Sequence, residues 1–275
     1  PLKGNPAEAA GLKAMDKIIE IDGTSTAGMD IDGAIKLIRG EPGTEVTLLI
    51  LRSGWSEPKE FTVTRAVITV PTMEWEMKPG NIAYFKLYNF NANLLPAWNV
   101  AATKALLGHP SGIVVDLRNN PGGYLDVATQ LTGWFVKRGD VIVREKFRGG
   151  NEEYIISSGN ESMYRIPVVV LVNEGSASAS EIVAGALRDL RGAKIVGQKT
   201  FGKGSVQEVE ELRHGSMIKI SIAEWLTPSG KSINKTGIEP DIEVKMTEED
   251  YEKKRDPQLD KAIDALLAEI SKSRR

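Results

Sequence analysis

The chain has 275 residues, enough for roughly two domains of about 150 residues and for a sizeable core. Hydrophobic residues make up 41% and charged residues 26%, the balance of an ordinary soluble globular protein. The formal net charge of −2 argues against nucleic acid as a partner, and no apolar run approaches the roughly 18 residues of a membrane helix. Cysteine is absent, which excludes disulfides, thiolate nucleophiles and sulfur-based metal sites.

Metal and cofactor chemistry has few candidate ligands in this sequence. His109 and His214 are the only histidines, and no ordered carboxylate loop of the calcium-binding type is present. We therefore expect no cofactor. The opening Pro1-Leu2-Lys3 has neither an initiator Met nor a signal-peptide pattern, so we expect that an upstream segment, including any targeting signal, has been removed.

Residues 1–66 are predicted to form a small α/β module. A short helix begins at Asn5-Pro6 and ends at Gly11, and apolar residues at helical spacing predict a second helix over Asp30–Arg39. Strands are expected over Asp16–Ile21, Glu45–Leu51 and Phe61–Thr64.

This module resembles a PDZ domain in three segments, PAEAAGL (6–12), DKIIEIDG (16–23) and IRGEPGT (38–44). The resemblance implies peptide recognition. PDZ domains hold the C-terminal carboxylate of a ligand on a Gly-containing loop near their start, and this chain begins after that point. If the loop is missing, we expect peptide capture by strand addition to be weakened or lost.

Residues 67–246 alternate between strands and helices. Near-continuous apolar strands between helices predict a sheet that is buried on both faces, with mostly parallel connections. Strands are expected over Asn81–Leu87, Gly112–Leu117, Val141–Val143 and Pro167–Val172, helices over Leu95–Leu107, Leu125–Val136 and Ser178–Leu190, and an antiparallel pair over Ser205–Leu212 and Met217–Leu226, joined by Arg213-His214-Gly215.

Residues 247–275 form a tail whose main element is a predicted helix over Asp256–Ile270. Its apolar stripe is wide for a segment at a chain end. We expect it to be a docking element, for instance in a homodimer. The alternative is that it packs on the core of its own chain.

Two strand-to-helix junctions carry unusual sequences. In Asp116–Tyr124, two glycines after Pro121 put bare N–H groups where a helix begins, which suits an anion; the alternative is a Gly-rich turn. In Asn173–Ile182, small residues crowd the start of a helix, which suits a serine nucleophile. The alternative there is a capping box formed by Ser178 and Glu181.

A serine nucleophile needs a base, and both histidines are expected to be surface residues. A lysine can take this role if burial lowers its pKa. Lys203 stands between Gly202 and Gly204 beside Phe201, although a solvated loop lysine is the alternative interpretation. Gln207 could orient its amine.

Taken together, SASASEI (176–182), TFGKGSVQ (200–207), DLRNNPGG (116–123) and GIEPD (237–241) resemble the carboxyl-terminal processing (tail-specific) proteases. In that family a serine nucleophile and a lysine base stand 25 positions apart, and Ser178 and Lys203 have this separation. The resemblance makes Gln207 the third member and rejects Ser176 and Ser180. It also implies backbone oxyanion donors at Ala179 and at a glycine of the Pro-Gly-Gly turn, Gly123 in preference to Gly122.

The resemblance implies an α/β, crotonase-like (ClpP/crotonase) protease core with a β-rich cap and an N-terminal PDZ module. The expected activity is that of a serine endopeptidase that cuts proteins near their C-termini without metal or ATP. The family works in the bacterial cell envelope or the chloroplast lumen, so we expect an extracytoplasmic location. Two alternatives are a catalytically inactive peptide-binding adaptor and a crotonase-like acyl-CoA enzyme.

Overall fold

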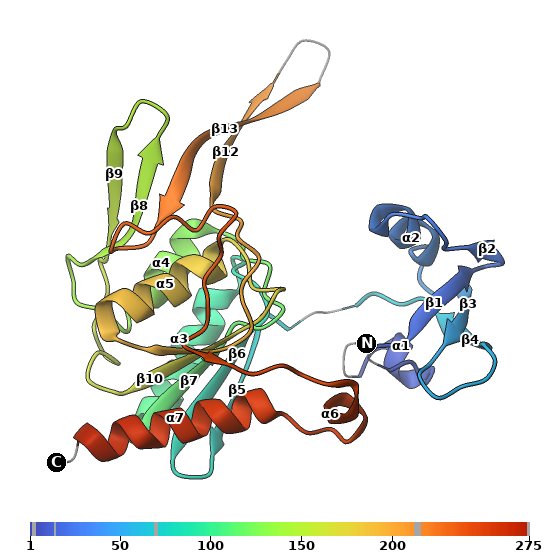
Figure 1. Cartoon of the computed structure of the whole chain (residues 1–275), viewed down its shortest axis with the longest axis horizontal. Helices are drawn as coiled ribbons and strands as arrows, with labels where there is room; N and C mark the ends of the chain where they lie inside the picture. The colour runs from blue at the N-terminus through green and yellow to red at the C-terminus, as the bar shows by residue number, and fades with distance from the viewer. Residues whose placement is uncertain (2–3, 14, 69–70, 212–215, 274–275) are drawn as a thin grey trace. The chain divides into compact units, whose positions relative to one another are not determined.

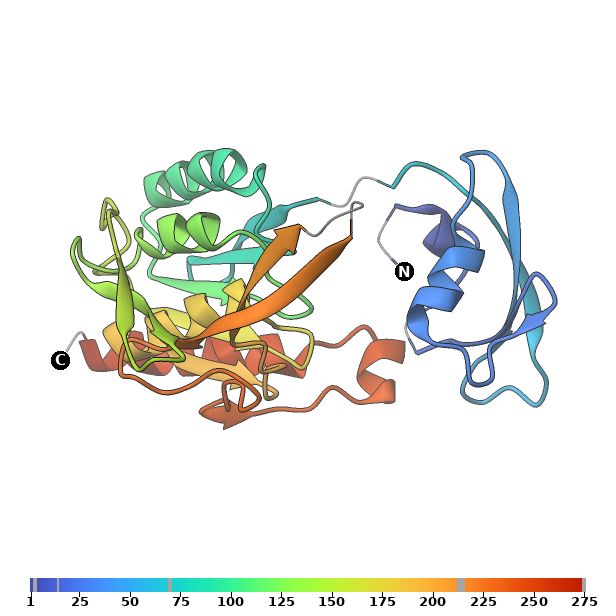
Figure 2. The ribbon, with the colours of Figure 1, turned by 90° about the horizontal axis from the view of Figure 1, so that it is seen from above.

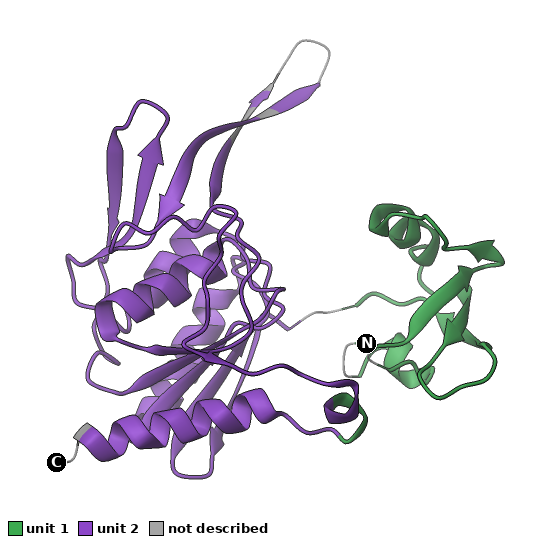
Figure 3. Ribbon diagram, viewed as in Figure 1, with its two compact units in different colours: residues 1–70, 251–253 green, residues 71–250, 254–275 purple. Residues whose placement is uncertain are grey.

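The computed structural model describes residues 1, 4–13, 15–68, 71–211 and 216–273, in two compact units (Figure 3). The first unit comprises residues 1–70 and 251–253, and the second residues 71–250 and 254–275. Among the described residues, no helix is both long and apolar enough to cross a membrane.

The first unit is built on a four-stranded antiparallel sheet in the order β2-β1-β3-β4. The predicted second helix is present as α2, and its N-terminus is capped by the Asp30 carboxylate, which accepts a hydrogen bond from Gly33 N at 2.7 Å. Its core consists of alternate strand residues: Ile21, Val46, Leu48, Ile50 and Val63. The elements are α1 (Pro6–Ala9), β1 (Lys17–Ile21), β2 (Thr24–Ser25), α2 (Ile31–Ile38), β3 (Glu45–Leu51) and β4 (Lys59–Thr64).

The second unit is built on a six-stranded sheet in the order β14-β11-β10-β7-β6-β5. The pairings confirm the predicted parallel arrangement, with β5 as an antiparallel edge strand. Its strands are β5 (Met73–Lys78), β6 (Ile82–Leu87), β7 (Gly112–Asp116), β10 (Val168–Val172), β11 (Lys194–Gly197) and β14 (Ile242–Glu243).

Helices cover both faces of this sheet, as the continuous apolar strands predicted (Figure 1). Val115 and Val170 face the layer of α3 (Leu94–Leu107), α4 (Leu125–Thr132) and α5 (Ala179–Arg191). Val114 and Leu171, one position away, face α7 (Pro257–Ser273) on the other side. The carboxyl ends of β7 and β10 lead into the two loops that were singled out in the sequence.

A second, antiparallel sheet in the order β12-β13-β8-β9 projects from the helical layer (Figures 1 and 2). It corresponds to the expected β-rich cap. Its strands are β8 (Val141–Phe147), β9 (Glu152–Ile156), β12 (Ser205–Glu211) and β13 (Met217–Leu226). The predicted turn at Arg213–Gly215 lies outside the described residues. A short helix, α6 (Glu248–Glu252), follows the central sheet in the chain.

The apolar stripe of α7 is buried on the chain's own sheet. Ala262 and Leu266 are fully buried, and Ile270 nearly so, against residues of β6, β7, β10 and β11. This is the alternative interpretation of the stripe. The width of the stripe therefore no longer argues for a docking or dimer surface, because packing within one chain accounts for it.

We predict that Leu266→Ala lowers the free energy of unfolding by about 2–5 kcal/mol, since it leaves a cavity beneath the sheet. The adjacent Leu267 is 40% exposed, so Leu267→Ala is a matched control that should cost about 1 kcal/mol or less. Urea unfolding followed by circular dichroism measures both. Equal losses in the two variants would contradict the burial of this helix face.

Candidate active site

Ser178 occupies a strained turn between β10 and α5. Its backbone has φ 56° and ψ −117°, a conformation that a residue with a Cβ rarely adopts. Such a conformation costs on the order of 1–3 kcal/mol and persists only where surrounding contacts impose it. The turn thus fixes Ser178 at the head of α5, at the carboxyl edge of the parallel sheet.

The three serines of the SASAS segment have different environments. Ser176 is fully buried, and its hydroxyl donates to Leu117 O at 2.8 Å. Ser180 is also fully buried, and its hydroxyl donates to Asn120 O at 2.9 Å. Ser178 is partly exposed. The outer two serines therefore fasten this loop to the loop after β7, and the middle one faces solvent.

The Glu181 carboxylate joins the Ser178 turn to the loop that carries Lys203. It is fully buried and accepts four hydrogen bonds. One comes from Ser178 N (2.8 Å), as expected for one half of a capping box. The other three come from Thr200 Oγ1 (2.5 Å), Gly202 N (2.7 Å) and Lys203 N (3.0 Å). The sequence identified Glu181 only as a capping residue and gave no signal for this second set of contacts.

Lys203 is exposed, which contradicts the expectation that burial would favour its neutral amine. Phe201 does not cover it, because that ring is itself 68% exposed. Gln207, on β12, is exposed as well. In the described part of the chain, no hydrogen bond joins Lys203 to the Ser178 hydroxyl or to Gln207. The structure therefore brings the Lys203 backbone, but not its amine, into the site.

The Pro-Gly-Gly turn packs directly against Ser178. A Cβ at Gly122 would lie 2.8 Å from Ser178 Cβ and 2.9 Å from Ala179 N, so only glycine fits there. Gly122 N donates to Asn120 Oδ1 at 2.9 Å. Within the described residues, the N–H groups of Gly123 and Ala179 have no acceptor, and Gly123 is exposed. This difference favours Gly123 over Gly122 as a donor to an anion.

Arg118 ties this turn to the C-terminal helix. Its guanidinium donates to the fully buried Asp116 carboxylate (2.6 Å) and, on the other side, to both oxygens of Asp256 (2.8 Å each). Tyr84 OH donates to Asp116 at 2.6 Å, and Gln258 accepts a further bond from Arg118 at 3.0 Å. The sequence analysis missed this network, because its partners are up to 140 positions apart.

These contacts shift the pKa values of the network. Burial, together with the Asp116 charge, raises the pKa of Tyr84. Burial opposes the charged form of Asp256, but hydrogen bonds and charge from Arg118 outweigh it and lower the pKa of Asp256. Arg118 and Asp256 are therefore charged at neutral pH, and the Tyr84 phenol is neutral.

The histidines contribute nothing to this site in the described structure. His109 is exposed in the loop after α3, as predicted, and His214 lies outside the described residues. Among the residues that the structure covers, no three His, Asp or Glu side chains gather where they could hold a metal ion.

Comparison with known proteins identifies two matched regions. A model of peptidase family S41 matches residues 81–244, and a PDZ domain model matches residues 1–52. The first region contains Ser178, Lys203 and Gln207 and every strand of the two sheets of the second unit except β5.

Similar proteins include two bacterial proteases and one solved structure. A probable CtpA-like serine protease of Staphylococcus haemolyticus is 40% identical over 89% of this chain and 49% of its own length. The carboxy-terminal processing protease CtpA of Bacillus subtilis is 37% identical over 92% of this chain and 53% of its own length. The chain thus spans about half the length of these relatives. A photosystem II D1 C-terminal processing protease is similar in structure, with a TM-score of 0.71, 34% identity and coverage of 89% of this chain and 67% of that one.

We predict that Asp256→Asn lowers the free energy of unfolding at pH 7 by about 1–2 kcal/mol, a modest loss because the Asp256 side chain is 34% exposed. A carboxylate with a lowered folded-state pKa stabilises the fold above its unfolded pKa, and this contribution is lost as the pH falls through the folded value. The deficit of the variant should therefore shrink below about pH 4.

Urea unfolding at neutral and acid pH measures this deficit. Asp260→Asn is a matched control, because Asp260 is an exposed carboxylate in the first turn of the same helix. A deficit that does not change with pH, or that is equal in the control, would show that the Arg118 contact does not stabilise the fold.

Proposed function

Because this chain belongs to peptidase family S41, we propose that it carries a serine endopeptidase activity that cuts protein chains near their C-termini. The observation that carries this proposal is the isolation of Ser178. It is the one serine of its segment whose hydroxyl makes no hydrogen bond to the backbone of the adjacent loop. It stands on a strained turn beside the N–H groups of Ala179 and Gly123, which have no acceptor among the residues that the structure describes.

In the proposed reaction, the Ser178 hydroxyl attacks the scissile carbonyl carbon. Lys203, as a neutral amine, accepts the hydroxyl proton and returns it to the leaving amine, which leaves an acyl-enzyme that water hydrolyses. The N–H groups of Ala179 and Gly123 stabilise the oxyanion. These two groups belong to a helix start and a glycine turn that are already fixed, so they need little reorganisation during the reaction.

For Lys203 to act as the base, its side chain must change conformation. Its backbone N–H is held by Glu181, while its side chain is exposed. In the active arrangement, the side chain turns from solvent toward Ser178 and is desolvated by the bound substrate, and Gln207 orients the amine. Removal from water disfavours the ammonium form, which supplies the neutral base.

The remaining parts of the proposal rest on the PDZ match and on the resemblance of the sequence to the carboxyl-terminal processing proteases. We assign to the PDZ domain the recognition or gating of substrate C-termini before they reach the active site, a crotonase-like arrangement to the core, and an extracytoplasmic location to the protein. The comparisons favour neither the inactive adaptor nor the acyl-CoA enzyme.

Ser178→Ala should reduce cleavage of an unfolded protein substrate by at least about 10³-fold without loss of fold, because it removes only the attacking hydroxyl. Ser176→Ala and Ser180→Ala are the controls. Each removes one of two hydrogen bonds to a carbonyl, because Leu117 O still accepts from Asn120 N and Asn120 O from Ala177 N. Each should therefore cost about 0.5–1.5 kcal/mol of stability while Ser178-dependent cleavage persists. Gel assays and urea unfolding give the two readouts. Equal proteolysis by wild type and Ser178→Ala would refute the assignment.

Lys203→Arg should be nearly inactive across the pH range, because a guanidinium does not deprotonate in proteins. Wild-type activity should rise toward alkaline pH along a single ionisation, since only the neutral amine accepts the proton. Lys199→Arg is a matched control: this exposed lysine pairs with Glu239 at 2.6 Å and should tolerate the change. A pH–rate curve for Lys203→Arg that follows that of the wild type would exclude Lys203 as the base.

A further inference from the structure

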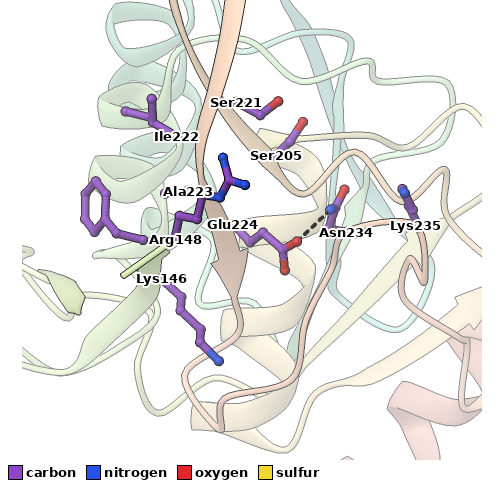
Figure 4. A pocket seen from close by; sticks show the side chains of 10 residues that line it. Lys146, Arg148, Ser205, Ser221, Ile222, Ala223, Glu224, Asn234 and Lys235 are labelled. Atoms are coloured by element: carbon purple, nitrogen blue, oxygen red, sulfur yellow. Dashed lines mark hydrogen bonds between the residues drawn. The ribbon is translucent and has the colours of Figure 1, made fainter. Parts of the chain in front are cut away.

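A pocket of about 580 Å³ opens between the cap sheet and the loop that follows β13 (Figure 4). It is separate from the Ser178 turn, and none of the proposed catalytic side chains lines it. Residues of β8 and the turn after it, of β12 and β13, and of the loop at 234–235 form its walls: Lys146, Phe147, Arg148, Ser205, Ser221, Ile222, Ala223, Glu224, Asn234 and Lys235.

The charge of the pocket is predominantly positive. Three of its side chains are cations, Lys146, Arg148 and Lys235, and Glu224 is its one carboxylate. That carboxylate is engaged, because Glu224 Oε1 accepts a hydrogen bond from Asn234 Nδ2 at 3.0 Å. In the part of the chain that the structure describes, neither Arg148 nor Lys235 has an ion-pair partner. An unneutralised cationic hollow concentrates anions and steers them to its surface.

The hydroxyl groups of the pocket, which could donate hydrogen bonds to an anion together with a cation, belong to Ser205 and Ser221. Figure 4 shows the Arg148 guanidinium directed toward the side where the Ser205 and Ser221 hydroxyls lie, while Lys146 extends away from it. Guanidinium and hydroxyl donors together suit a carboxylate, which accepts several hydrogen bonds through its two oxygens. Arg148 and these two hydroxyls are thus the part of the pocket that best fits such a ligand, and Lys235 supplies a second cation across the pocket, beyond Glu224 and Asn234 (Figure 4).

The pocket shares a wall with the loop that holds Lys203. Lys235 N donates to Gly202 O at 2.8 Å, and a Cβ at Gly204 would lie 2.3 Å from Asn234 N. Ser205, which lines the pocket, is two positions after Lys203. The backbone next to the proposed base is therefore also the backbone that shapes the cationic hollow.

The location of the pocket beside the Lys203 loop places it near one product of the proposed reaction. The base returns its proton to the leaving amine, so the fragment on the C-terminal side of the cleaved bond begins next to Lys203. When cleavage occurs near the substrate's C-terminus, that fragment is short and ends in a carboxylate. We propose that the pocket of Arg148 and Lys235 binds a carboxylate of this leaving fragment, an inference that rests on the proposed function.

The test compares three otherwise identical short peptides that differ in the fragment after the cleaved bond. One ends in a free carboxylate, one in a neutral amide, and one in an amide preceded by a glutamate. For the wild type, kcat/KM should be about threefold to tenfold higher for the first peptide than for the second, a ratio that decreases with salt. The third peptide distinguishes a terminal carboxylate from a side-chain carboxylate.

The Arg148→Gln/Lys235→Gln variant should bring this ratio close to one and leave kcat/KM for the neutral peptide unchanged. Arg138→Gln/Lys231→Gln removes the same charge from exposed positions outside the pocket and should retain the ratio. A ratio that the pocket variant does not change would overturn the inference, because the carboxylate would then be recognised elsewhere, for example by the PDZ domain.

A binding measurement separates this result from a failure of the proposed function. If no peptide is cleaved in a Ser178-dependent way, the peptidase proposal fails, whereas equilibrium binding of the labelled peptides still tests the pocket. In a Ser178→Ala background, the free-carboxylate peptide should bind about threefold to tenfold more tightly with the pocket intact than with Arg148 and Lys235 replaced. Equal binding would refute the pocket as a carboxylate site.

Discussion

The buried carboxylate of Glu181 is the interaction on which the candidate site depends. A charge without solvent is costly unless hydrogen bonds replace its hydration, and here four donors do so. They come from two segments, the turn at Ser178 and the loop at 200–203, which a backbone hydrogen bond from Phe201 N to Ser176 O also joins. Ser178 and Lys203 are 25 residues apart in the sequence, and these hydrogen bonds hold their backbones in a fixed position relative to each other.

The two sides of the site differ in how far they are prepared for chemistry. The side of the proposed nucleophile is fixed by the strained turn at Ser178, the buried hydroxyls of Ser176 and Ser180, and a glycine contact that permits no Cβ. On the base side, the backbone of Lys203 is held but its side chain is exposed. In the proposed reaction, the preorganised part of the site is therefore the part where charge would develop on the substrate carbonyl, and the remaining adjustment would be made by the Lys203 side chain.

The sequence predicted those features that have local causes. Strands β6, β7 and β10 were evident because their apolar runs reflect burial on both faces, and the Ser178 and Pro-Gly-Gly loops because their composition is unusual. The edge strands β5 and β14 were not predicted. The exposure of Lys203 was missed because flanking residues do not reveal where a side chain points. The contact between Arg118 and Asp256 joins positions 138 residues apart, and neither residue has a local signal for it.

Because α7 packs on one face of the six-stranded sheet, that face can be buried only after α7 has been synthesised. Val114, Val169 and Leu171 lie in strands that are translated before α7, and the helix that shields them from water is encoded some 90 to 150 positions later. During translation, a ribosome-bound chain must therefore carry an uncovered apolar sheet face until α7 emerges. Chaperones that bind exposed apolar surface would find a target in this interval, and the docking of α7 would remove it.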